Sequence, residues 1–346
     1  MAKKLRAGVI GCGSIAQALH LPGYARQPGV ALVAACDPDK KRRAEAVGGF
    51  GVERTYADYR EMLAVEELDV VSVCSPNRFH AEQAVAALQA GAHVLLEKPA
   101  ALSMKEIDRI KAAVRKSGKI LIVGYSHRFH RGNLKAKKLV ESGAIGEPYM
   151  IRVRFAHMGP FPGWAKSDWF YKPELAGGGA LLDMGIHAID QCLWFCGPVR
   201  SVQATAVTLR KDIQLDDNAV VQLEFANGKT LGYIEVGWTS PTGFNGVEIM
   251  GDGGSILIDY ANGMTLTTGK VTPNLKARVQ RKTRLLDPKP TTGGWSIEVA
   301  ELVKHIRMKS DRGHGIDAGG AALQVALAAY ESSRTGRRVK LMRGRG

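Results

Sequence analysis

Lys98 stands in the tripeptide Glu97-Lys98-Pro99, directly after the short apolar run 93–96. Such a run, bounded by turn residues, is typical of a buried parallel strand. Ligands of open parallel sheets bind outside the carboxyl ends of the strands. A lysine delivered to that place is costly to bury unless its ammonium group is paired or used. The sequence therefore predicts that Lys98 takes part in catalysis or substrate binding.

The proline of this tripeptide indicates how the lysine is aimed. Pro99 fixes its own backbone and biases Lys98 toward an extended conformation. The strand must turn abruptly at this point if Lys98 is to face a ligand, and a cis X–Pro bond is the usual low-cost way to make such a turn. We therefore expect the Lys98–Pro99 peptide bond to be cis.

A glycine-rich turn follows the first apolar run and opens a helix. It reads Gly11-Cys12-Gly13-Ser14-Ile15-Ala16. In this G-x-G-x-x-A pattern, Gly11 permits a tight turn, Gly13 lets the backbone approach a pyrophosphate, and Ala16 lets the helix pack close to the strand. The pyrophosphate then lies at a helix N-terminus, where free N–H groups favour an anion. The pattern predicts a dinucleotide site that includes Ser14 and Ile15.

Asp37 ends the second apolar run, 21 residues past Ala16 (37 − 16). A carboxylate at this spacing accepts hydrogen bonds from the ribose hydroxyls and repels a 2′-phosphate, so it favours NAD over NADP. NADP stays possible because the basic run 40–43 follows closely. The alternatives are that Asp37 caps the next helix and that residues 40–43 are a solvated helix face.

Polar side chains also follow the apolar run 70–74. Ser75 comes directly after it, Asn77 two residues later, and His80 three residues after Asn77. We expect Ser75 and Asn77 to contact the cofactor, Asn77 at its ribose or nicotinamide. For His80, a cofactor contact competes with simple support of the turn.

A nearly all-apolar helix is predicted over 179–196 and should be buried. Asp183, His187 and Asp190 lie at i, i+4 and i+7, so they form one polar stripe on it. A histidine between two carboxylates on a buried helix suits a general base with an orienting carboxylate. The alternative is a core histidine satisfied by Asp183. No further ligands accompany the stripe, so no metal site is expected.

Strand and helix signals alternate over the first third of the chain, which predicts βαβ units and a parallel sheet. The pattern changes near Gly124, and after Gly146 runs with period-two alternation predict an antiparallel sheet with hairpins, interrupted by the helix at 179–196. Residues 270–294 are predicted to be irregular. The fold class is α/β, with a dinucleotide-binding domain at 1–125 and a second domain at 126–346. The closing helix near 318–334 is a candidate to pack back on the first domain.

The expected elements are as follows. Strands are predicted at 7–10, 30–36, 70–74, 93–96, 120–123, 149–158, 202–209, 219–225, 230–238, 247–250, 256–260 and 264–268. Helices are predicted at 14–24, 40–47, 59–64, 81–90, 105–116, 133–141, 179–196, 296–309 and 318–334.

Composition narrows the class of partner. The chain has 346 residues and a net charge of +15, but its basic residues are mostly scattered, without aromatic interleaving, zinc spacing or a helix-turn-helix pattern. We therefore expect a small-molecule substrate and no nucleic acid. Five cysteines without paired spacing suit a reducing compartment. No run is long enough to span a membrane, so we expect no membrane contact and a cytoplasmic location.

The motifs and their order resemble the Gfo/Idh/MocA family, named after glucose–fructose oxidoreductase and inositol 2-dehydrogenase. The resemblance covers essentially the whole chain. It rests on the glycine-rich turn and on Asn77-x-x-His80, Glu97-Lys98-Pro99, Gly124-Tyr125 with Arg128-Phe129, Gly177-Gly178-Gly179 before Asp183-x-x-x-His187, and 328–336. Ser126 departs from the pattern, since many members have asparagine there.

The resemblance implies a Rossmann domain followed by an α/β domain with a large, mostly antiparallel sheet. It implies NAD(P)-dependent oxidation or reduction of sugars, polyols and related alcohols, with homodimers or homotetramers formed through the open face of the second sheet. It also places Glu97 and Lys98 among the residues at the cofactor, and Tyr125 and Arg128 among those at the substrate.

The resemblance further implies that Lys98, Asp183 and His187 meet in a cleft between the domains. His187 would take the proton of a secondary hydroxyl while hydride passes to the nicotinamide. Lys98 would hydrogen-bond the substrate oxygen or relay the proton, and Asp183 would orient the histidine or bind a neighbouring hydroxyl. Trp164 and Trp169 are candidates to stack on a sugar face, with packing at a boundary as the alternative.

Two other functions stay open on this fold. One is an NAD-dependent glycosidase that oxidises its substrate transiently, and the other is a non-catalytic dinucleotide sensor. The intact set of Lys98, Asp183 and His187 argues against the sensor. Net formation of NADH with a sugar panel would separate a dehydrogenase from both.

Overall fold

The computed structural model describes residues 4–269, 282–289 and 297–341. These residues form two compact units. Unit 1 holds the described residues of 1–126, 160–177 and 295–323, and unit 2 holds those of 127–159, 178–294 and 324–346. Two segments that follow residue 126 in the chain therefore belong to the first unit.

The six-stranded sheet of unit 1 is parallel throughout and has the order β3-β2-β1-β4-β5-β6. Its strands are β1 (Leu5–Ile10), β2 (Val30–Cys36), β3 (Arg54–Tyr56), β4 (Val70–Val73), β5 (His93–Leu96) and β6 (Leu121–Val123). In this doubly wound order, the direction of winding reverses between β1 and β4. Ligands bind at that reversal, where Gly11 follows β1 and Cys74 follows β4.

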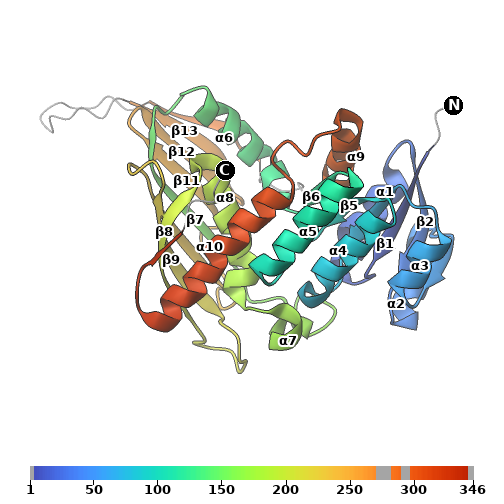
Figure 1. The fold of residues 1–346 in the computed structure, drawn as a ribbon. Helices are drawn as coiled ribbons and strands as arrows, with labels where there is room; N and C mark the ends of the chain where they lie inside the picture. The colour runs from blue at the N-terminus through green and yellow to red at the C-terminus, as the bar shows by residue number, and fades with distance from the viewer. Residues whose placement is uncertain (1–3, 270–281, 290–296, 342–346) are drawn as a thin grey trace, which may run out of the picture. The chain divides into compact units, whose positions relative to one another are not determined.

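Five helices connect these strands (Figure 1): α1 (Leu21–Arg26), α2 (Lys40–Phe50), α3 (Tyr59–Val65), α4 (His80–Gln89) and α5 (Met104–Ser117). Unit 1 also holds α7 (Pro173–Ala176) and α9 (Glu298–Met308), which come later in the chain. Local sequence sets their ends, as α5 shows. The Ser103 hydroxyl accepts the N–H of Glu106 at its start, and Gly118 ends it in the left-handed region with φ 65°.

The nine-stranded sheet of unit 2 has the order β14-β13-β12-β11-β7-β10-β9-β8-β15. Neighbours are antiparallel except for the parallel pair β7 and β10. The strands are β7 (Pro148–Ala156), β8 (Val199–Val207), β9 (Asn218–Phe225), β10 (Leu231–Gly237), β11 (Gly246–Gly251), β12 (Gly254–Asp259), β13 (Gly263–Thr268), β14 (Lys282–Asp287) and β15 (Val339–Lys340).

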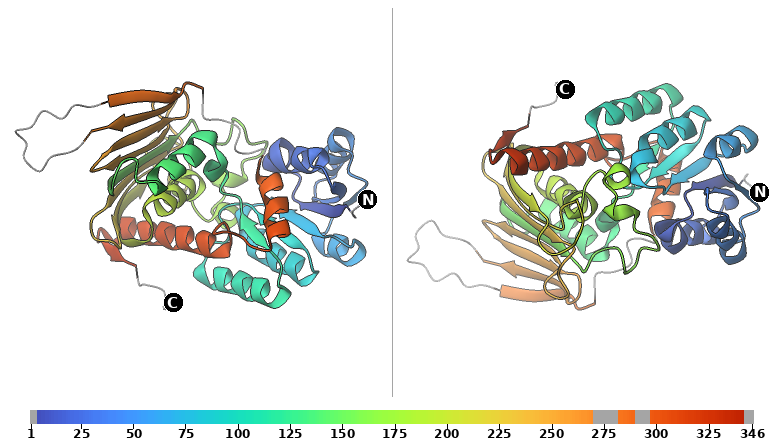
Figure 2. Two further views of the ribbon diagram at one scale, coloured as in Figure 1. Left: turned by 90° about the horizontal axis from the view of Figure 1, so that it is seen from above. Right: turned by 90° about the horizontal axis from the view of Figure 1, so that it is seen from below.

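One face of this sheet is covered by helices. Helices α6 (Arg131–Glu141) and α8 (Ile186–Cys196) lie on it, with the part of α10 (Ile316–Thr335) that belongs to unit 2 (Figures 1 and 2). Strand β9 alternates buried and exposed residues, as a strand with one covered face does. Its outward side and that of β10 expose Val220, Leu231 and Tyr233.

The predicted fold class is confirmed: unit 1 has a parallel Rossmann sheet, and the sheet of unit 2 is mostly antiparallel. The irregular segment predicted over 270–294 is wrong for residues 282–287, which form β14, while 270–281 and 290–294 lie outside the described residues. An edge strand buries little, so β14 lacks the alternation that marked the others. The three-residue strand β3 is also absent from the prediction.

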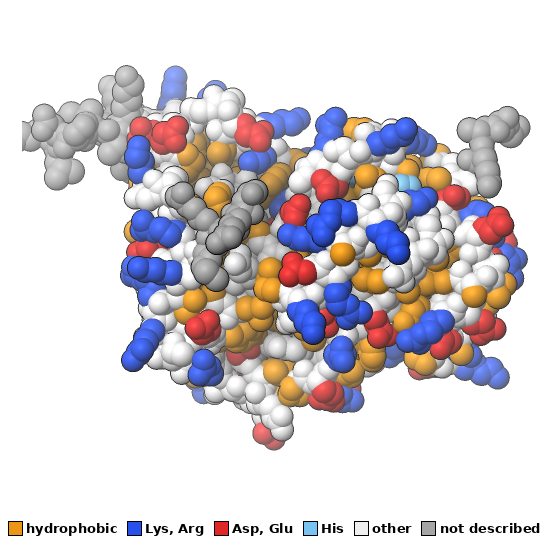
Figure 3. Space-filling model, in the orientation of Figure 1, with side chains coloured by type: hydrophobic (Ala, Val, Ile, Leu, Met, Phe, Trp, Pro, Cys, Tyr) orange, Lys and Arg blue, Asp and Glu red, His pale blue; other side chains and the backbone are white. Residues whose placement is uncertain are grey.

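Charge is dispersed over one face of the molecule. On the face that Figure 3 shows, Lys and Arg side chains are interspersed with Asp and Glu and do not gather into one basic patch. Within the described ranges, no helix combines the length and the apolar character needed to cross a membrane.

The start of the helix that bears Asp183 and His187 is fixed by Asp216 of unit 2. The Asp216 carboxylate accepts the N–H groups of Gly179 (2.9 Å) and Leu181 (2.7 Å) and the hydroxyl of Tyr330 (2.8 Å). Its backbone oxygen accepts the N–H of Ala180 at 2.8 Å. These bonds satisfy N–H groups that a helix start leaves without intrahelical partners. A π-helical turn (Leu181–Gly185) then leads into α8.

The close approach of the two backbones explains the second and third glycines of the Gly177-Gly178-Gly179 run. A Cβ at Gly179 would lie 1.9 Å from the Asp216 carbonyl oxygen, and one at Gly178 would lie 2.5 Å from the Tyr330 hydroxyl. A side chain at either position would push the helix start away from Asp216.

We expect Gly179→Ala to destabilise the protein by about 1–3 kcal/mol, the usual cost of overpacking a tight contact. Gly48→Ala is the matched control, because Gly48 is exposed in α2 and its Cβ would meet nothing within 4 Å. The control should be neutral or stabilising by up to about 1 kcal/mol. Denaturant titration followed by circular dichroism measures both, and equal midpoints would contradict the role of this contact.

Candidate active site

The glycine-rich turn of unit 1 has the geometry that a dinucleotide needs. Gly11 has a φ of 87°, and a Cβ there would lie 2.7 Å from the backbone nitrogen of Ser75. A Cβ at Gly13 would meet no atom within 4 Å. Gly11 is therefore required by the protein itself, whereas Gly13 faces open space in which a pyrophosphate can approach the backbone.

Asp37 is buried directly after β2, and its carboxylate binds the backbone of the glycine-rich turn. Its Oδ2 accepts the N–H of Cys12 at 2.8 Å, and its Oδ1 accepts the N–H of Asp39 at 2.9 Å. The cap of α2 is Asp39, whose side chain accepts from the N–H groups of Lys41 and Arg42. The alternative interpretation of Asp37 as the helix cap is therefore wrong.

The basic run lies beside Asp37. Arg42 Nη1 is 3.9 Å from Asp37 Oδ2, and Arg43 donates to the Asp37 carbonyl oxygen at 2.6 Å. Residues 40–43 are therefore more than a solvated helix face, because two of their side chains flank the carboxylate expected to bind ribose.

The segment 160–177, which sequence reasoning treated only as an aromatic stretch, packs on the glycine-rich turn within unit 1. The N–H of Lys166 donates to the Ser14 hydroxyl at 2.8 Å, and its ammonium group contacts Gln17. At the far end of the segment, the Asn77 amide donates to the Ala176 carbonyl at 2.8 Å. Ser14 and Asn77, two predicted cofactor residues, therefore bind this segment. No signal in the sequence marked Lys166 as the partner of Ser14.

The backbone around Lys98 is anchored on both sides. The Lys98 N–H donates to Glu97 Oε2 at 3.2 Å. A ring nitrogen of His80 lies 2.7 Å from the Pro99 carbonyl oxygen, and the other lies 2.8 Å from that of Ser75. The Lys98–Pro99 bond is cis, as predicted. His80 therefore ties the end of β4 to the end of β5, which supports the alternative assigned to it, support of the turn.

The environment of His80 favours a neutral ring. Burial lowers the pKa of His80, and the contacts with the Pro99 and Ser75 carbonyls and the charge of Glu97 only partly oppose it. A neutral imidazole carries a single N–H, so it donates to one of the two carbonyl oxygens and only packs against the other.

In unit 2, Asp183 and His187 are both buried, at 4% and 6% exposure. Trp238, at the end of β10, donates its indole N–H to Asp183 Oδ2 at 3.2 Å. The His187 ring lies against that of His127, with centroids 4.5 Å apart. The helix is held firmly at both positions, as a site that orients an imidazole requires.

The third member of the predicted stripe has a different partner. Asp190 binds the Arg128 guanidinium through two hydrogen bonds, of 2.8 and 2.6 Å, and both side chains are buried. Burial raises the pKa of Asp190, while the charge and hydrogen bonds of Arg128 oppose that rise. Asp190 is therefore paired with the Arg128 guanidinium, and Asp183 is the carboxylate of the stripe that is predicted to orient His187.

The remaining candidates lie in unit 1. Tyr125 is buried after β6. Trp164 is half exposed, and Trp169 stacks on Phe170 with ring centroids 3.9 Å apart. Trp164 meets the same Phe170 edge-on at 5.1 Å. Such a small aromatic group with one open ring suits either sugar stacking or packing against another surface.

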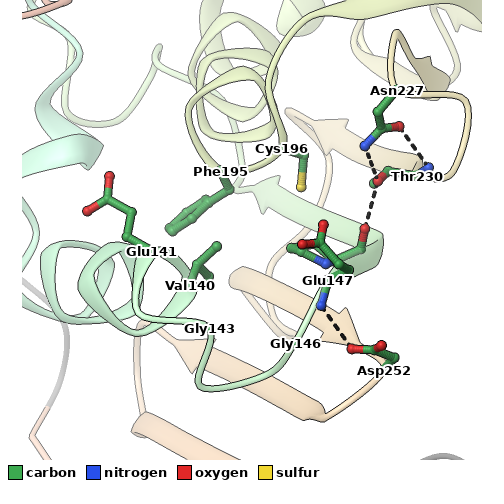
Figure 4. A pocket seen from close by; sticks show the side chains of 11 residues that line it. Val140, Glu141, Gly143, Gly146, Glu147, Phe195, Cys196, Asn227, Thr230 and Asp252 are labelled. Atoms are coloured by element: carbon green, nitrogen blue, oxygen red, sulfur yellow. Dashed lines mark hydrogen bonds between the residues drawn. The ribbon is translucent and has the colours of Figure 1, made fainter.

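A separate pocket of 480 Å³ lies in unit 2 and contains none of the predicted site residues (Figure 4). It is lined by Val140, Glu141, Gly143, Gly146, Glu147, Pro148, Phe195, Cys196, Asn227, Thr230 and Asp252. Its polar side chains are largely used in local structure: Asp252 accepts the N–H of Glu147, and Thr230 donates to the Pro148 carbonyl. These bonds hold the loop before β7 in place.

The structure thus gathers two groups of predicted residues. Unit 1 brings the glycine-rich turn, Asp37, His80 and Lys98 to the carboxyl ends of one sheet. Unit 2 holds Asp183 and His187 together on one helix.

Two family models match this chain, one over each part of it. Residues 5–125 match the model of an oxidoreductase family with an NAD-binding Rossmann fold, and residues 133–257 match the GFO/IDH/MocA C-terminal domain. The D-glucoside 3-dehydrogenase of Escherichia coli K12 is 29% identical over 97% of both chains. The myo-inositol 2-dehydrogenase of Thermotoga maritima is 32% identical over 76% of this chain and 77% of its own.

Solved structures show the same fold. GenD2 from gentamicin A biosynthesis, in complex with NAD, has a TM-score of 0.84 at 27% identity and covers 99% of this chain and 98% of its own. Levoglucosan dehydrogenase with NADH and L-sorbose has a TM-score of 0.82 at 25% identity, covering 97% and 98%. The chain belongs to the Gfo/Idh/MocA family of oxidoreductases, and its unit 1 is an NAD-binding Rossmann fold.

Proposed function

We propose that the protein is an NAD-dependent dehydrogenase that transfers a hydride between the nicotinamide and a secondary alcohol or ketone of a sugar, polyol or sugar derivative. The observation that carries this proposal is the double anchoring of the Lys98 backbone, by Glu97 and by His80 through Pro99. It fixes a lysine at the carboxyl end of β5, in the sheet whose β1 end bears the glycine-rich turn. Binding sites of doubly wound sheets lie at such strand ends.

Each residue has a distinct task in this proposal. NAD, when bound, supplies the ring that accepts the hydride. His187 takes the hydroxyl proton of the substrate as a general base, and Asp183 orients its imidazole. Lys98 donates a hydrogen bond to the substrate oxygen and stabilises the negative charge that develops on it.

The relatives support the substrate class. Their names give a D-glucoside, myo-inositol and levoglucosan as substrates, and all three are cyclic polyhydroxylated compounds. The buried imidazole and carboxylate that unit 2 holds on one helix are polar groups of the kind that bind the hydroxyls of a polyol. The open ring of Trp164 offers an apolar face of the kind on which sugars stack.

A panel of sugars, polyols and sugar acids, each mixed with NAD and followed at the absorbance of NADH, tests this proposal. We expect substrate-dependent growth of absorbance with at least one class of compound. Release of a free sugar from a glycoside without net NADH would instead assign the NAD-dependent glycosidase activity.

The contacts around Asp37 bear on the choice of cofactor. Its buried carboxylate is fixed by two backbone N–H groups, in the position expected to accept from the ribose hydroxyls. Arg42 and Arg43 partly offset its charge. We propose that NAD is preferred over NADP, and that the two arginines make the preference moderate.

We further propose that copies of the chain associate through the outward face of the nine-stranded sheet, as a dimer or tetramer. Val220, Leu231 and Tyr233 are 41%, 51% and 37% exposed on that face. Light scattering on the purified protein tests this, and a monomer at micromolar concentration would refute it. A cytoplasmic location is supported by the five free cysteines, four of them buried.

We expect Gly13→Ala to weaken NADH binding by at least about tenfold, because the new methyl group would fill the space for the pyrophosphate. Thermal stability should be unchanged, since that methyl group meets no protein atom. Gly49→Ala, in open space on α2, is the control. Calorimetric titration measures the affinities for NADH and NADPH, and a thermal melt measures stability. Unchanged NADH affinity in the variant, or tighter NADPH binding by the wild type, would contradict this description of the site.

We expect Lys98→Met and His187→Ala each to lower kcat by at least about a hundredfold, the scale of general acid–base groups. NADH affinity should stay close to that of the wild type. Lys116→Met, which removes an exposed lysine of α5, is the control and should leave kcat unchanged. Near-normal turnover in either variant on the true substrate would remove that residue from the mechanism.

A further inference from the structure

Three buried ionisable side chains meet in unit 1, beside Lys98. They are His20, which ends the π-helical turn before α1, Glu97 after β5, and Glu298, the first residue of α9. One side-chain nitrogen or oxygen atom of each residue lies within 4.8 Å of the others. The residues are 1%, 7% and 2% exposed. Nothing in the proposed reaction so far uses His20 or Glu298.

A chain of hydrogen bonds leads into this cluster and ends on Glu97. Tyr24 and Ser72 hydroxyl oxygens are 2.8 Å apart, Ser72 Oγ is 3.0 Å from His20 Nδ1, and His20 Nε2 is 2.8 Å from Glu97 Oε1. Burial raises the pKa of Tyr24, so its phenol remains a donor. Every donor in this chain has an acceptor if Tyr24 donates to Ser72, Ser72 donates to His20 Nδ1, and His20 Nε2–H donates to Glu97.

This direction requires Glu97 to be a carboxylate. Its Oε1 then accepts from His20, and its Oε2 accepts the Lys98 backbone N–H at 3.2 Å. Burial alone would raise the pKa of Glu97, but the hydrogen bond from His20 and the charge of Lys98 hold it below its ordinary value.

Glu298 has the opposite environment. Within the described residues, its Oε1 has no hydrogen-bond partner, and the side chain is fully enclosed. A second carboxylate so close to Glu97 would be repelled by it and would lack solvent. Burial, followed by the charge of Glu97, raises the pKa of Glu298 well above its ordinary value. Of these two neighbouring carboxyl groups, Glu298 is therefore the one that keeps a proton, and Glu97 is the one that is ionised.

We propose that His20, Glu97 and Glu298 form a buried proton-holding site that positions Lys98, with Glu298 as a neutral acid that lets Glu97 keep its charge and its bond to the Lys98 backbone. This inference rests on the proposed function, because its effect on turnover acts through Lys98. If Glu298 lost its proton, the two carboxylates would repel each other, and the hydrogen bond between Glu97 and the Lys98 backbone N–H would weaken.

Other titratable groups face the cluster from the elements packed around it. They are Tyr24 of α1, Cys74 after β4, His80 of α4 and Lys98 itself. Burial raises the pKa of the Cys74 thiol and lowers that of the His80 ring, so both are neutral near pH 7. Lys98 is the one cation among these groups, and it faces both carboxyl groups.

The geometry fits a proton better than a metal ion. The 2.8 Å between His20 Nε2 and Glu97 Oε1 is a hydrogen-bond length. Two ligands of one tetrahedral ion, each about 2.0 Å from it, would be about 3.3 Å apart. The adjacent Lys98 would also repel a cation. Elemental analysis of the purified protein distinguishes the two, and a stoichiometric metal that is lost in a Glu298 variant would overturn the proposal.

The test compares wild type, Glu298→Gln and Glu298→Met as apoproteins in thermal and denaturant unfolding from pH 5 to 9. Unfolded Glu298 ionises above about pH 4.3, whereas the folded acid keeps its proton. The folded state thus binds more protons, and wild-type stability falls as pH rises through this window. Both variants lack the ionisable group. As pH rises, the ratio of folded to unfolded protein in each variant should therefore increase relative to that of the wild type, by up to about tenfold per pH unit.

Glu298→Met keeps the test valid if the glutamine amide cannot be accommodated. Glu301→Gln is the matched control, since Glu301 lies one turn further along α9 and pairs with Lys304. It should show no such pH-dependent gain. A stability difference for both Glu298 variants that is constant with pH, or that moves against them as pH rises, would show that Glu298 is ionised in the folded protein and overturn the proposal.

The pH dependence of kcat/KM tests the link to Lys98. We expect the alkaline limb of the wild-type profile to move to higher pH in Glu298→Gln, because the group whose ionisation loosens the lysine is gone. An unchanged limb together with the expected stability pattern would refute the positioning role. Absence of activity on every compound would refute the proposed function, while the apoprotein experiment would still decide the proton site.

Discussion

The buried carboxylate of Glu97 is the contact on which the arrangement of unit 1 depends. One oxygen faces His20, and the other holds the backbone of Lys98. The loop after β6 also adapts to it, since a Cβ at Gly124 would lie 3.3 Å from Glu97 Oε1. His80 lies between the ends of β4 and β5. Together, Glu97 and His80 therefore contact the ends of three neighbouring strands, β4, β5 and β6. The lysine is thus placed by its backbone.

Unit 2 uses carboxylates for the same purpose, each with a different partner. Asp216 anchors the start of the helix, Asp183 accepts from Trp238 of the sheet, and Asp190 binds Arg128. A buried carboxylate needs several donors, and a single histidine cannot satisfy two of them. The stripe on the helix therefore divides, and only Asp183 stays available to orient His187. Helical spacing identified the face but could not assign its partners.

The elements that the sequence predicts correctly are those that depend on residues close together in the chain. The spacing of Gly11, Gly13 and Asp37 and the alternation of strands and helices gave the Rossmann unit, because these depend on residues close together in the chain. The edge strand β14 and the three-residue β3 were missed because pairing with a neighbour, not burial, defines them. Glu298 carried no signal, since an acidic residue at a helix start is ordinary, and only folding brings it to Glu97.

The origin of α9 has a consequence for how the molecule is made. Val299, Leu302 and Val303 belong to the same buried cluster as Leu21 and Tyr24, although they lie much later in the chain. A Cβ at Gly23 would lie 2.8 Å from Val299 Cγ2, so the two helices are in close contact. On the ribosome, the first-made sheet emerges with this apolar face uncovered, and it waits for nearly the whole of unit 2 to be synthesised. Chaperones that bind exposed apolar surface during translation would act on this face until α9 is made.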